Sequence, residues 1–539
     1  MHLNDSGLKD RTQWQKAGIR LPAFNREQMI AATKKEPVWV HFGAGNIFRA
    51  FPAALQQELL NRGFSKKGII TVEGYDEEII DRMYRPHDNL SLLVTLKSDG
   101  TIDKTVIGSI AESLKADSSL ADEFARLKEI FRSESLQMVS FTITEKGYRL
   151  TRGNGELLPD VQADFSSGPA KPVSYIGKLT ALCYERYLHG ARPLALVSMD
   201  NCSHNGAKLY AAVHTFAEKW TENGKAERGF LSYIEDPSRV SFPWSMIDKI
   251  TPRPDAGVKA MLEKAGFEDT KGEITAKKTY VAPFVNSEET QYLVIEDQFP
   301  NGRPPLEKAG VMFTDRATVE KTERMKVCTC LNPLHTALAI FGCLLGYTKI
   351  CDEMKDKDLV ALIRRIGYRE GLPVVTDPGI LSPKAFLDEV INVRLPNPFM
   401  PDTPQRIVTD TSLKIPIRYG ETIKSYLSSD RLEKSSLKMI PLTLAGWCRY
   451  LLGVDDSGKP FDRSPDPMMN ELTAMLSGVK LGQKGPFHEA LRPILANREI
   501  FGVDLYEAGL GDTVEADFAE MAASKGAVRA ALKRHLADE

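Results

Sequence analysis

The chain has 539 residues, which is too many for a single hydrophobic core and predicts at least two large domains. Hydrophobic residues make up 42% and charged residues 26% of it, as in an ordinary globular protein. The formal net charge of −2 gives no indication of a nucleic-acid or membrane partner, and seven thinly spread cysteines argue against a disulfide framework. With no secretory signal at the N-terminus, we expect a cytoplasmic enzyme, either a monomer or a small homo-oligomer.

The first clear pattern is a strand followed by a glycine turn. The apolar run Val38–Phe42 predicts a buried strand, which leads into Gly43-Ala-Gly45-Asn46 and then a helical pattern that continues to Asn61. This arrangement suits a dinucleotide pyrophosphate, because glycines let the backbone approach the phosphates and the helix N-terminus supplies N–H groups. A turn of this kind also occurs for geometry alone, Phe48 stands where a third glycine is expected, and Pro52 interrupts the helix early.

The next predicted strand, residues 68–73, ends in an acid 28 positions after Gly45. An acid there can accept hydrogen bonds from ribose hydroxyls and repel a 2′-phosphate, which favours NAD over NADP. Asp76 is the competing candidate, and for either acid the alternative is a solvated charge at a strand end. The candidate cofactor-binding residues are Gly43, Gly45, Asn46, Arg49, Glu73 and Asp76.

Two later strands end in polar clusters, where open α/β sheets bind ligands. The predicted strand 137–143 delivers Thr144-Glu145-Lys146-Gly-Tyr148, and the predicted strand 193–199 ends in Asp200-Asn201. Asn201 can donate a hydrogen bond to a reacting oxygen, and Asp200 can orient a neighbour. The alternative is that Ser203 or Asn205 in this cluster caps the following helix.

Three intervening segments have simpler patterns. Residues 92–96 and 105–110 predict an antiparallel hairpin added to a mainly parallel sheet. Residues 151–172 and the proline-rich segment Phe242–Pro252, which carries Asp248, predict loops.

Helical periodicity dominates from about residue 318 onward. Predicted helices include 319–347, with a kink at Pro333, and 514–536. The expected fold class is α/β, with a Rossmann-like NAD-binding domain (1–315) around a mainly parallel sheet. A mostly α-helical domain (316–539) for substrate binding and catalysis would follow it.

A lysine, an amide and an imidazole occur at the start of the apolar stretch of this second domain. Asn332 and His335 are three residues apart and share a helix face, and Lys326 precedes them. Lysine can act as a base where an apolar environment lowers its pKa. A core helix with a polar first turn is the alternative. Cys328 and Cys330 point to different faces of a helix, and no second ligand pair lies nearby, so we expect no metal.

Five motifs together resemble the polyol-specific long-chain dehydrogenase family. They are Phe42–Ala50, Thr142–Tyr148, Ser198–Gly206, Phe242–Pro252 and Phe501–Leu505, in the order of that family, and the resemblance extends over nearly the whole chain. It implies hydride transfer between a sugar carbinol carbon and NAD, without a metal.

The resemblance also implies roles for individual residues. Lys326 would be the general base, Asn201 and Asn332 would hold the developing alkoxide, and His335 would position the substrate. Glu145 would relay the proton to solvent, and Asp248 matches a position near the active site.

One spacing departs from the pattern of mannitol 2-dehydrogenase. Five residues separate Lys326 from Asn332, one more than expected, which turns Lys326 by about 100° on an ideal helix. A π-bulge would restore the alignment, and such bulges occur at functional sites.

Within the family, Cys328–His335 followed by Thr-Ala-Leu-Ala most resembles the mannonate oxidoreductase branch. This implies interconversion of D-mannonate and D-fructuronate. Tagaturonate reductase (altronate oxidoreductase) and mannitol 2-dehydrogenase are alternatives within the class, and a non-catalytic NAD-binding protein is the alternative outside it. A hexonate carboxylate needs a cation, for which Arg418 and Arg49 are candidates, with an interdomain or surface ion pair as the other interpretation.

Overall fold

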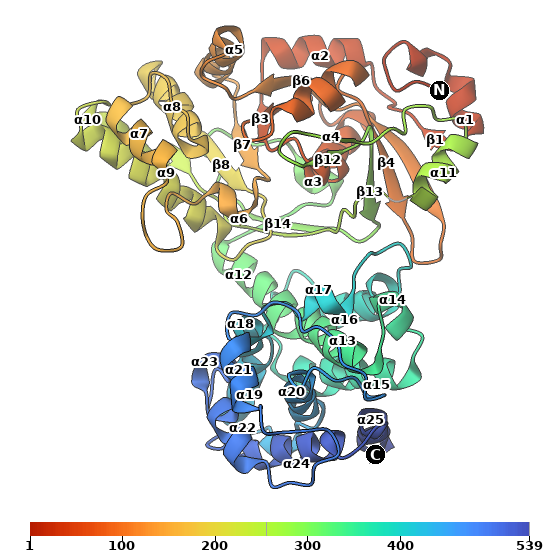
Figure 1. Cartoon of the computed structure of the whole chain (residues 1–539). Coiled ribbons are helices and arrows are strands. Elements are labelled where there is room, and N and C mark those ends of the chain that lie inside the picture. Colours follow the sequence, from red (N-terminus) through yellow and green to blue (C-terminus); the bar gives the residue numbers. More distant parts are fainter. Residues whose placement is uncertain (255, 538–539) are drawn as a thin grey trace. The chain divides into compact units, whose positions relative to one another are not determined.

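The computed structural model describes residues 1–254 and 256–537 (Figure 1). The chain divides into two compact units. The first unit comprises residues 1–97 and 101–320, and the second unit begins at Lys321 and also includes residues 98–100. The boundary expected from the sequence lies between residues 315 and 316.

A six-stranded sheet forms the centre of the first unit. Its strands run in the order β6 (Ile110–Lys115), β3 (Ile69–Glu73), β2 (Trp39–Phe42), β7 (Met138–Phe141), β8 (Leu194–Ser198) and β9 (Val240–Ser241). Every neighbouring pair is parallel. The strand order reverses between β2 and β7, so the C-terminal ends of these two strands flank the position where such sheets bind ligands. The predicted Rossmann-like fold is confirmed.

Both faces of this sheet are covered, which explains why its central strands are almost continuously apolar. Val40, Phe42 and Val139 pack with one set of helices, namely α5 (Ala121–Arg132), α8 (Tyr175–Leu188), α9 (Asn205–Glu222) and α10 (Arg228–Glu235). Trp39 and Met138 point to the other face, where they pack with α3 (Asn46–Ala50) and α4 (Pro52–Asn61). Figure 1 shows α7, α8, α9 and α10 grouped together on one side of the strands.

The predicted hairpin exists but belongs to a different sheet. β4 (Ser91–Leu96) and β5 (Ile102–Ile107) pair antiparallel, yet they join β1 (Ile19–Arg20) and β13 (Phe284–Glu288) in a separate four-stranded sheet. The prediction that the hairpin extends the parallel sheet was therefore wrong. Its parallel partner β13 lies almost 190 residues further along the chain, and no local pattern indicates such a pairing.

Two segments that we expected to be loops contain regular structure. Residues 151–172 include helix α7 (Pro159–Ser167), which begins with a proline at its first position. The segment Phe242–Pro252 includes β10 (Ser245–Asp248), which pairs with β14 (Tyr292–Glu296), itself parallel to β15 (Met312–Thr314). A two-stranded sheet of β11 (Glu273–Ile274) and β12 (Tyr280–Val281) completes the first unit.

The second unit is helical, as predicted. α13 (Asn332–Leu345) lies at its centre and packs against α15 (Lys357–Arg365), α17 (Pro404–Ile407) and α20 (Met439–Tyr450). α20 in turn packs against α24 (Gly511–Ala522), and α24 against α25 (Ala527–Ala537). The sequence suggested one helix over 514–536, but Gly526 adopts φ +80° and separates α24 from α25.

Four π-helical turns interrupt the helices in the described part of the second unit. They are η5 (Met325–Cys330), η6 (Ile366–Gly371), η8 (Val390–Arg394) and η9 (Pro416–Gly420). The long helical stretch that contains η5, Arg316–Leu345, meets the length and composition of a membrane span. However, 78% of its apolar window is buried inside the protein, as in a core helix.

Candidate functional site

The turn after β2 has two glycines with different structural requirements. Gly43 adopts φ +107°, and a Cβ at this position would lie 2.2 Å from the carbonyl oxygen of Thr142. The fold therefore requires a glycine there. A Cβ on Gly45 would meet no heavy atom within 4 Å in the part of the chain that the structure describes. Gly45 thus leaves open space beside the backbone.

The helical pattern that follows this turn is interrupted at Pro52, as expected. α3 ends at Ala50, Phe51 breaks the helix with φ −127° and ψ −73°, and Pro52 then starts α4. Proline cannot donate the backbone hydrogen bond that an uninterrupted helix would need. Phe48, at the expected third-glycine position, is buried and stacks on His41 with ring centroids 4.2 Å apart.

Glu73 is a buried acid that organises the backbone around it. One carboxylate oxygen accepts hydrogen bonds from the N–H groups of Gly74, Tyr75 and Asp76 at 2.8–3.2 Å, and the other accepts from Ala44 N–H at 2.9 Å. Burial raises the pKa of Glu73, and these backbone hydrogen bonds oppose that rise. The solvated strand-end charge considered for Glu73 is therefore excluded by its burial.

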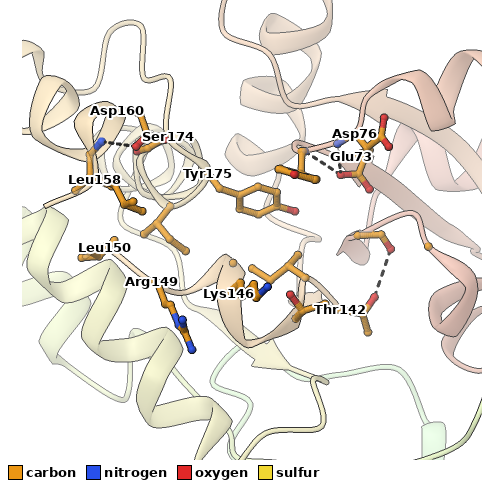
Figure 2. Close-up of a pocket in the computed structure, with 18 of the residues that line it drawn as sticks. Glu73, Asp76, Thr142, Lys146, Arg149, Leu150, Leu158, Asp160, Ser174 and Tyr175 are labelled. Atoms are coloured by element: carbon orange, nitrogen blue, oxygen red, sulfur yellow. Dashed lines mark hydrogen bonds between the residues drawn. The ribbon is translucent and has the colours of Figure 1, made fainter. Parts of the chain in front are cut away.

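A cavity of about 520 Å³ opens beside this turn (Figure 2). Gly43, Gly45, Glu73 and Asp76 all line it, which brings four of the predicted cofactor-binding residues together. Figure 2 shows the ring of Tyr175 extending into the middle of the cavity, with Glu73 and Asp76 on one side. The buried Tyr175 hydroxyl has no hydrogen-bond partner among the described residues. Tyr175 was not identified from the sequence, where it is the first residue of an otherwise ordinary helix.

Asn46 and Arg49 are not among the described residues that line this cavity. The guanidinium of Arg49 is buried and donates to the carbonyl of Ala282 at 2.7 Å and to the Asn46 side chain at 2.8 Å. Its Nε has no partner in the described part of the chain. Desolvation lowers the pKa of Arg49. Arg49 therefore fixes α3 to the segment that precedes β13.

The polar cluster after β8 does not cap α9. His204 occupies the cap position and makes no capping hydrogen bond, while the Asn205 amide donates to the carbonyls of Asp200 and Ser245, both at 3.0 Å. The helix-cap alternative was therefore wrong, and Asn205 instead joins the ends of β8 and β10. Asn201 is exposed at the end of β8, and Asp248 is buried at the end of β10.

Glu145 lies on α6 (Thr144–Gly147), which begins three residues after the end of β7. Its carboxylate forms an ion pair with Lys208 at 2.7 Å, and both side chains are partly exposed. The hydrogen bond from Lys208 is the main cause that lowers the pKa of Glu145.

In the second unit, Lys326 lies in the π-helical turn that its spacing suggested. The N–H of Leu331 donates to the carbonyl of Lys326 at 3.0 Å, five residues back, within η5. The chain bends at Leu331, with φ −123° and ψ −61°, and α13 begins at Asn332. The expected kink is therefore present two residues before Pro333. Lys326 is buried.

His335 is a neutral imidazole at neutral pH. Burial lowers its pKa to about 4, assisted by the charges of Arg418, Arg406 and Arg394 and opposed by Asp402. Asp402 lies 3.6 Å from its Nε2, which is too far for a hydrogen bond. Nε2 has no hydrogen-bond partner among the described residues. The arginine cluster around His335 was not recognised from the sequence, since its members are 59 to 83 residues away.

Arg418 is a largely desolvated cation near the same helix. It lies in η9 and donates to the Thr336 hydroxyl at 2.6 Å. Burial lowers its pKa to about 10, and no carboxylate is paired with it within the described residues of the second unit. Arg418 thus forms no surface ion pair within its own unit, and the interdomain ion pair stays the alternative interpretation.

Within the described residues, one group has the side chains and spacing to hold a metal ion. Asp517, Glu520 and His535 bring their ligand atoms within 4.8 Å of one another, but Arg534 already donates to Glu520 at 2.7 Å. Cys328 and Cys330 belong to no such group in this part of the chain.

Comparison with known proteins identifies the family. The family model described as "Mannitol dehydrogenase Rossmann domain" matches residues 38–308, and "Mannitol dehydrogenase C-terminal domain" matches residues 318–522. A D-mannonate oxidoreductase of Thermotoga maritima is 53% identical over 99% of this chain and 98% of its own length. A mannitol 2-dehydrogenase of Neosartorya fischeri is 29% identical, covering 94% of this chain and 93% of that protein.

Solved structures agree with this result. The mannitol 2-dehydrogenase of Pseudomonas fluorescens, in a ternary complex with NAD and D-mannitol, has a TM-score of 0.70 at 27% identity over the full length of both chains. A D-sorbitol dehydrogenase in substrate-free form has a TM-score of 0.80 at 24% identity, covering 99% of this chain and all of the other, which supports the fold. The chain belongs to the mannitol dehydrogenase family.

Proposed function

We propose that this chain is an NAD-dependent oxidoreductase that interconverts D-mannonate and D-fructuronate without a metal. The observation that carries the proposal is the 53% identity, over nearly the whole length of both chains, to a protein named D-mannonate oxidoreductase. Residues 1–315 would bind the cofactor, and residues 316–539 would carry the substrate-binding and catalytic groups.

The cavity beside the glycine turn fits a dinucleotide. The space beside Gly45 admits a phosphate close to the backbone, and the unpartnered Tyr175 hydroxyl offers a hydrogen bond to a ligand. The Glu73 oxygen that accepts from Ala44 alone can accept a further bond from a ribose hydroxyl, and its charge would repel a 2′-phosphate. Asp76, which also lines the cavity, belongs to the proposed set. Asn46 and Arg49, which are not among the described residues that line it, are proposed as cofactor-binding residues from the sequence alone. Bound NAD would supply the hydride acceptor and donor.

The chain would supply the proton transfer and the polar groups around the reacting oxygen. We assign Lys326 as the general base that takes the hydroxyl proton, with the amides of Asn201 and Asn332 donating to the developing alkoxide. The neutral His335, with its unpartnered Nε2, would hydrogen-bond a substrate hydroxyl and so orient the sugar. Glu145 would pass the proton to solvent, in keeping with its exposure, and Asp248 would lie near the substrate.

Arg418 supports a substrate that carries a carboxylate. Its guanidinium is desolvated and uses one N–H for Thr336, which leaves further donors in a planar fork. A carboxylate at this position would both satisfy those donors and neutralise the buried charge. A polyol such as mannitol would leave the charge uncompensated.

Mannitol oxidation is a second candidate, because both family models and the NAD complex with D-mannitol carry the mannitol dehydrogenase name. The cytoplasmic location and the monomeric or small homo-oligomeric state expected from the sequence stay predictions.

The test compares D-fructuronate, D-tagaturonate and D-fructose as oxidants of NADH, with NADPH in parallel. The proposal expects the highest kcat/KM with fructuronate and NADH. Preference for fructose would favour mannitol oxidation, and preference for tagaturonate would favour altronate as the product. Binding of NADH without turnover of any of the three would refute the assignment.

A further inference from the structure

Thr144 has a strained backbone at the edge of the cavity. It lies three residues after the end of β7 and adopts φ +64°, in the left-handed region. A β-branched residue very rarely adopts this conformation, because its side chain crowds the backbone. Such a conformation persists only where the surrounding structure holds it. The residues that hold it are therefore expected to have a specific role.

The carboxylate of Asp200 holds the backbone of Thr144 in this conformation. One of its oxygens accepts from Thr144 N–H at 2.8 Å, and the other accepts from Ile143 N–H at 3.0 Å and from the Tyr148 hydroxyl. Asp200 is itself fixed, since its carbonyl accepts from Cys202 N–H at 2.9 Å and from the Asn205 amide at 3.0 Å. A single buried carboxylate at the end of β8 thus fastens the turn after β7 at three points.

This turn forms part of the cavity wall and contacts the glycine turn. Thr142, Ile143 and Thr144 all line the cavity, and Figure 2 shows Thr142 at its edge. The Thr142 carbonyl lies so close to Gly43 that no Cβ fits between them. A change in the backbone at Thr144 would therefore be transmitted to Gly43, next to the space where we place the cofactor phosphates.

We propose that Asp200 is a positioning residue, which holds the left-handed turn at Thr144 and thereby keeps the segment Thr142–Thr144 in the shape that the cofactor cavity requires. The identity of the ligand rests on the proposed function. Asp200 itself is not among the described residues that line the cavity, so it acts through Thr144.

The test measures the Kd for NADH of Asp200→Asn in three backgrounds: the unchanged chain, T144G and T144A. In either orientation the new amide group would place an NH2 against at least one N–H or O–H donor, so a contact is lost. Glycine adopts the left-handed region without strain, whereas alanine retains a Cβ and the strain. T144A is therefore the matched control, because it also removes the threonine side chain.

We expect D200N to raise the Kd for NADH about tenfold in the unchanged chain, as expected for the loss of one hydrogen bond to a charged group. In the T144G background D200N should raise the Kd for NADH less than about threefold. In the T144A background it should again raise this Kd about tenfold. An equal effect of D200N in all three backgrounds would overturn the inference, because a general structural role does not depend on the φ angle of Thr144.

Tyr148→Phe is the second variant, for the case in which D200N does not fold. It removes one donor to Asp200 and leaves both backbone contacts, so we expect a weakening of about threefold that T144G again reduces. If the unchanged chain binds NADH and a folded variant, D200N or Tyr148→Phe, binds it equally well, the inference alone is overturned. If the unchanged chain does not bind NADH, both the inference and the cofactor assignment are overturned.

Discussion

Replacing Arg418 by methionine should stabilise the free protein and weaken the binding of a sugar acid. The reason is that Arg418 is a desolvated cation with no carboxylate partner among the described residues of its own unit. Its pKa falls from 12.5 to about 10, which corresponds to about 3 kcal/mol of unfavourable burial. Because the pKa in the folded protein lies well above 7, both states are protonated at neutral pH and the full cost is present. The increase in the free energy of unfolding caused by Arg418→Met should therefore be the same at pH 6 and pH 8.

The methionine variant also loses the hydrogen bond to Thr336, at a cost of about 1 kcal/mol. The net gain is then about 1–2 kcal/mol, or about 4 °C in unfolding temperature for a unit of this size. Loss of charge-assisted hydrogen bonds to a carboxylate should raise the KM for fructuronate about 100-fold. D-Fructose, which lacks the carboxylate, should be affected far less.

Thermal unfolding without ligands, together with steady-state kinetics for fructuronate and fructose, measures both effects. Arg431→Met is the matched control, since Arg431 is exposed in the same unit and its substitution should change the unfolding temperature by less than about 1 °C. A lower unfolding temperature for Arg418→Met than for the control would contradict the premise that the charge of Arg418 is uncompensated and destabilises the folded protein. An unchanged KM for fructuronate would refute Arg418 as the carboxylate ligand.

Three further results are expected. Lys326→Ala should lower kcat at neutral pH by about 10²–10⁴-fold while NADH, followed by its fluorescence, still binds; near-normal turnover would refute Lys326 as the base. Gly45→Val should raise the Kd for NADH without lowering the unfolding temperature. Gly43→Ala should lower the unfolding temperature, because its Cβ would lie 2.2 Å from a carbonyl oxygen. A lower unfolding temperature for Gly45→Val but not for Gly43→Ala would contradict this turn geometry. The hydrogen bond to Asp517 raises the pKa of His535, so this contact contributes stability below the unfolded pKa of about 6.5 and loses it as pH rises through the folded pKa. Unfolding temperatures of the unchanged chain and His535→Gln should therefore differ most near pH 6 and converge by pH 9, and a difference that does not vary with pH would exclude this contact as its cause.

Local patterns predicted the elements of the first unit well, because burial on both faces leaves a clear apolar run. The strands at 39–42 and 69–73 and the helix Tyr175–Leu188 agree with the sequence within one or two residues. The glycine turn, the acid that ends β3 (Glu73) and Asp76 also line one cavity, as parallel strands that end at the same edge would require. Their role in cofactor binding stays a prediction.

The features that the sequence did not predict depend on contacts between distant residues. The sheet to which β4 belongs is decided by β13, and the environment of Glu73 is decided by the backbone of Ala44, which the sequence presents only as part of a glycine turn. The left-handed turn at Thr144 has no local signature at all, since threonine is a residue that ordinarily avoids it. Strain of this kind is stabilised from elsewhere in the chain, and the sequence around it does not reveal it.

The π-helical turn η5 affects how residues can be equated between relatives. It holds one residue more than an α-helical turn, so a relative that lacks this residue can retain the helices on both sides and lose only the turn. If an alignment places its gap elsewhere, it pairs Lys326 with a position rotated by about 100° around the helix. A one-codon insertion or deletion at η5 would likewise change which side chain is presented ahead of Asn332 and leave the packing of α13 intact. A change in chain length at η5 would thus exchange the group at this position without substituting any residue of the core.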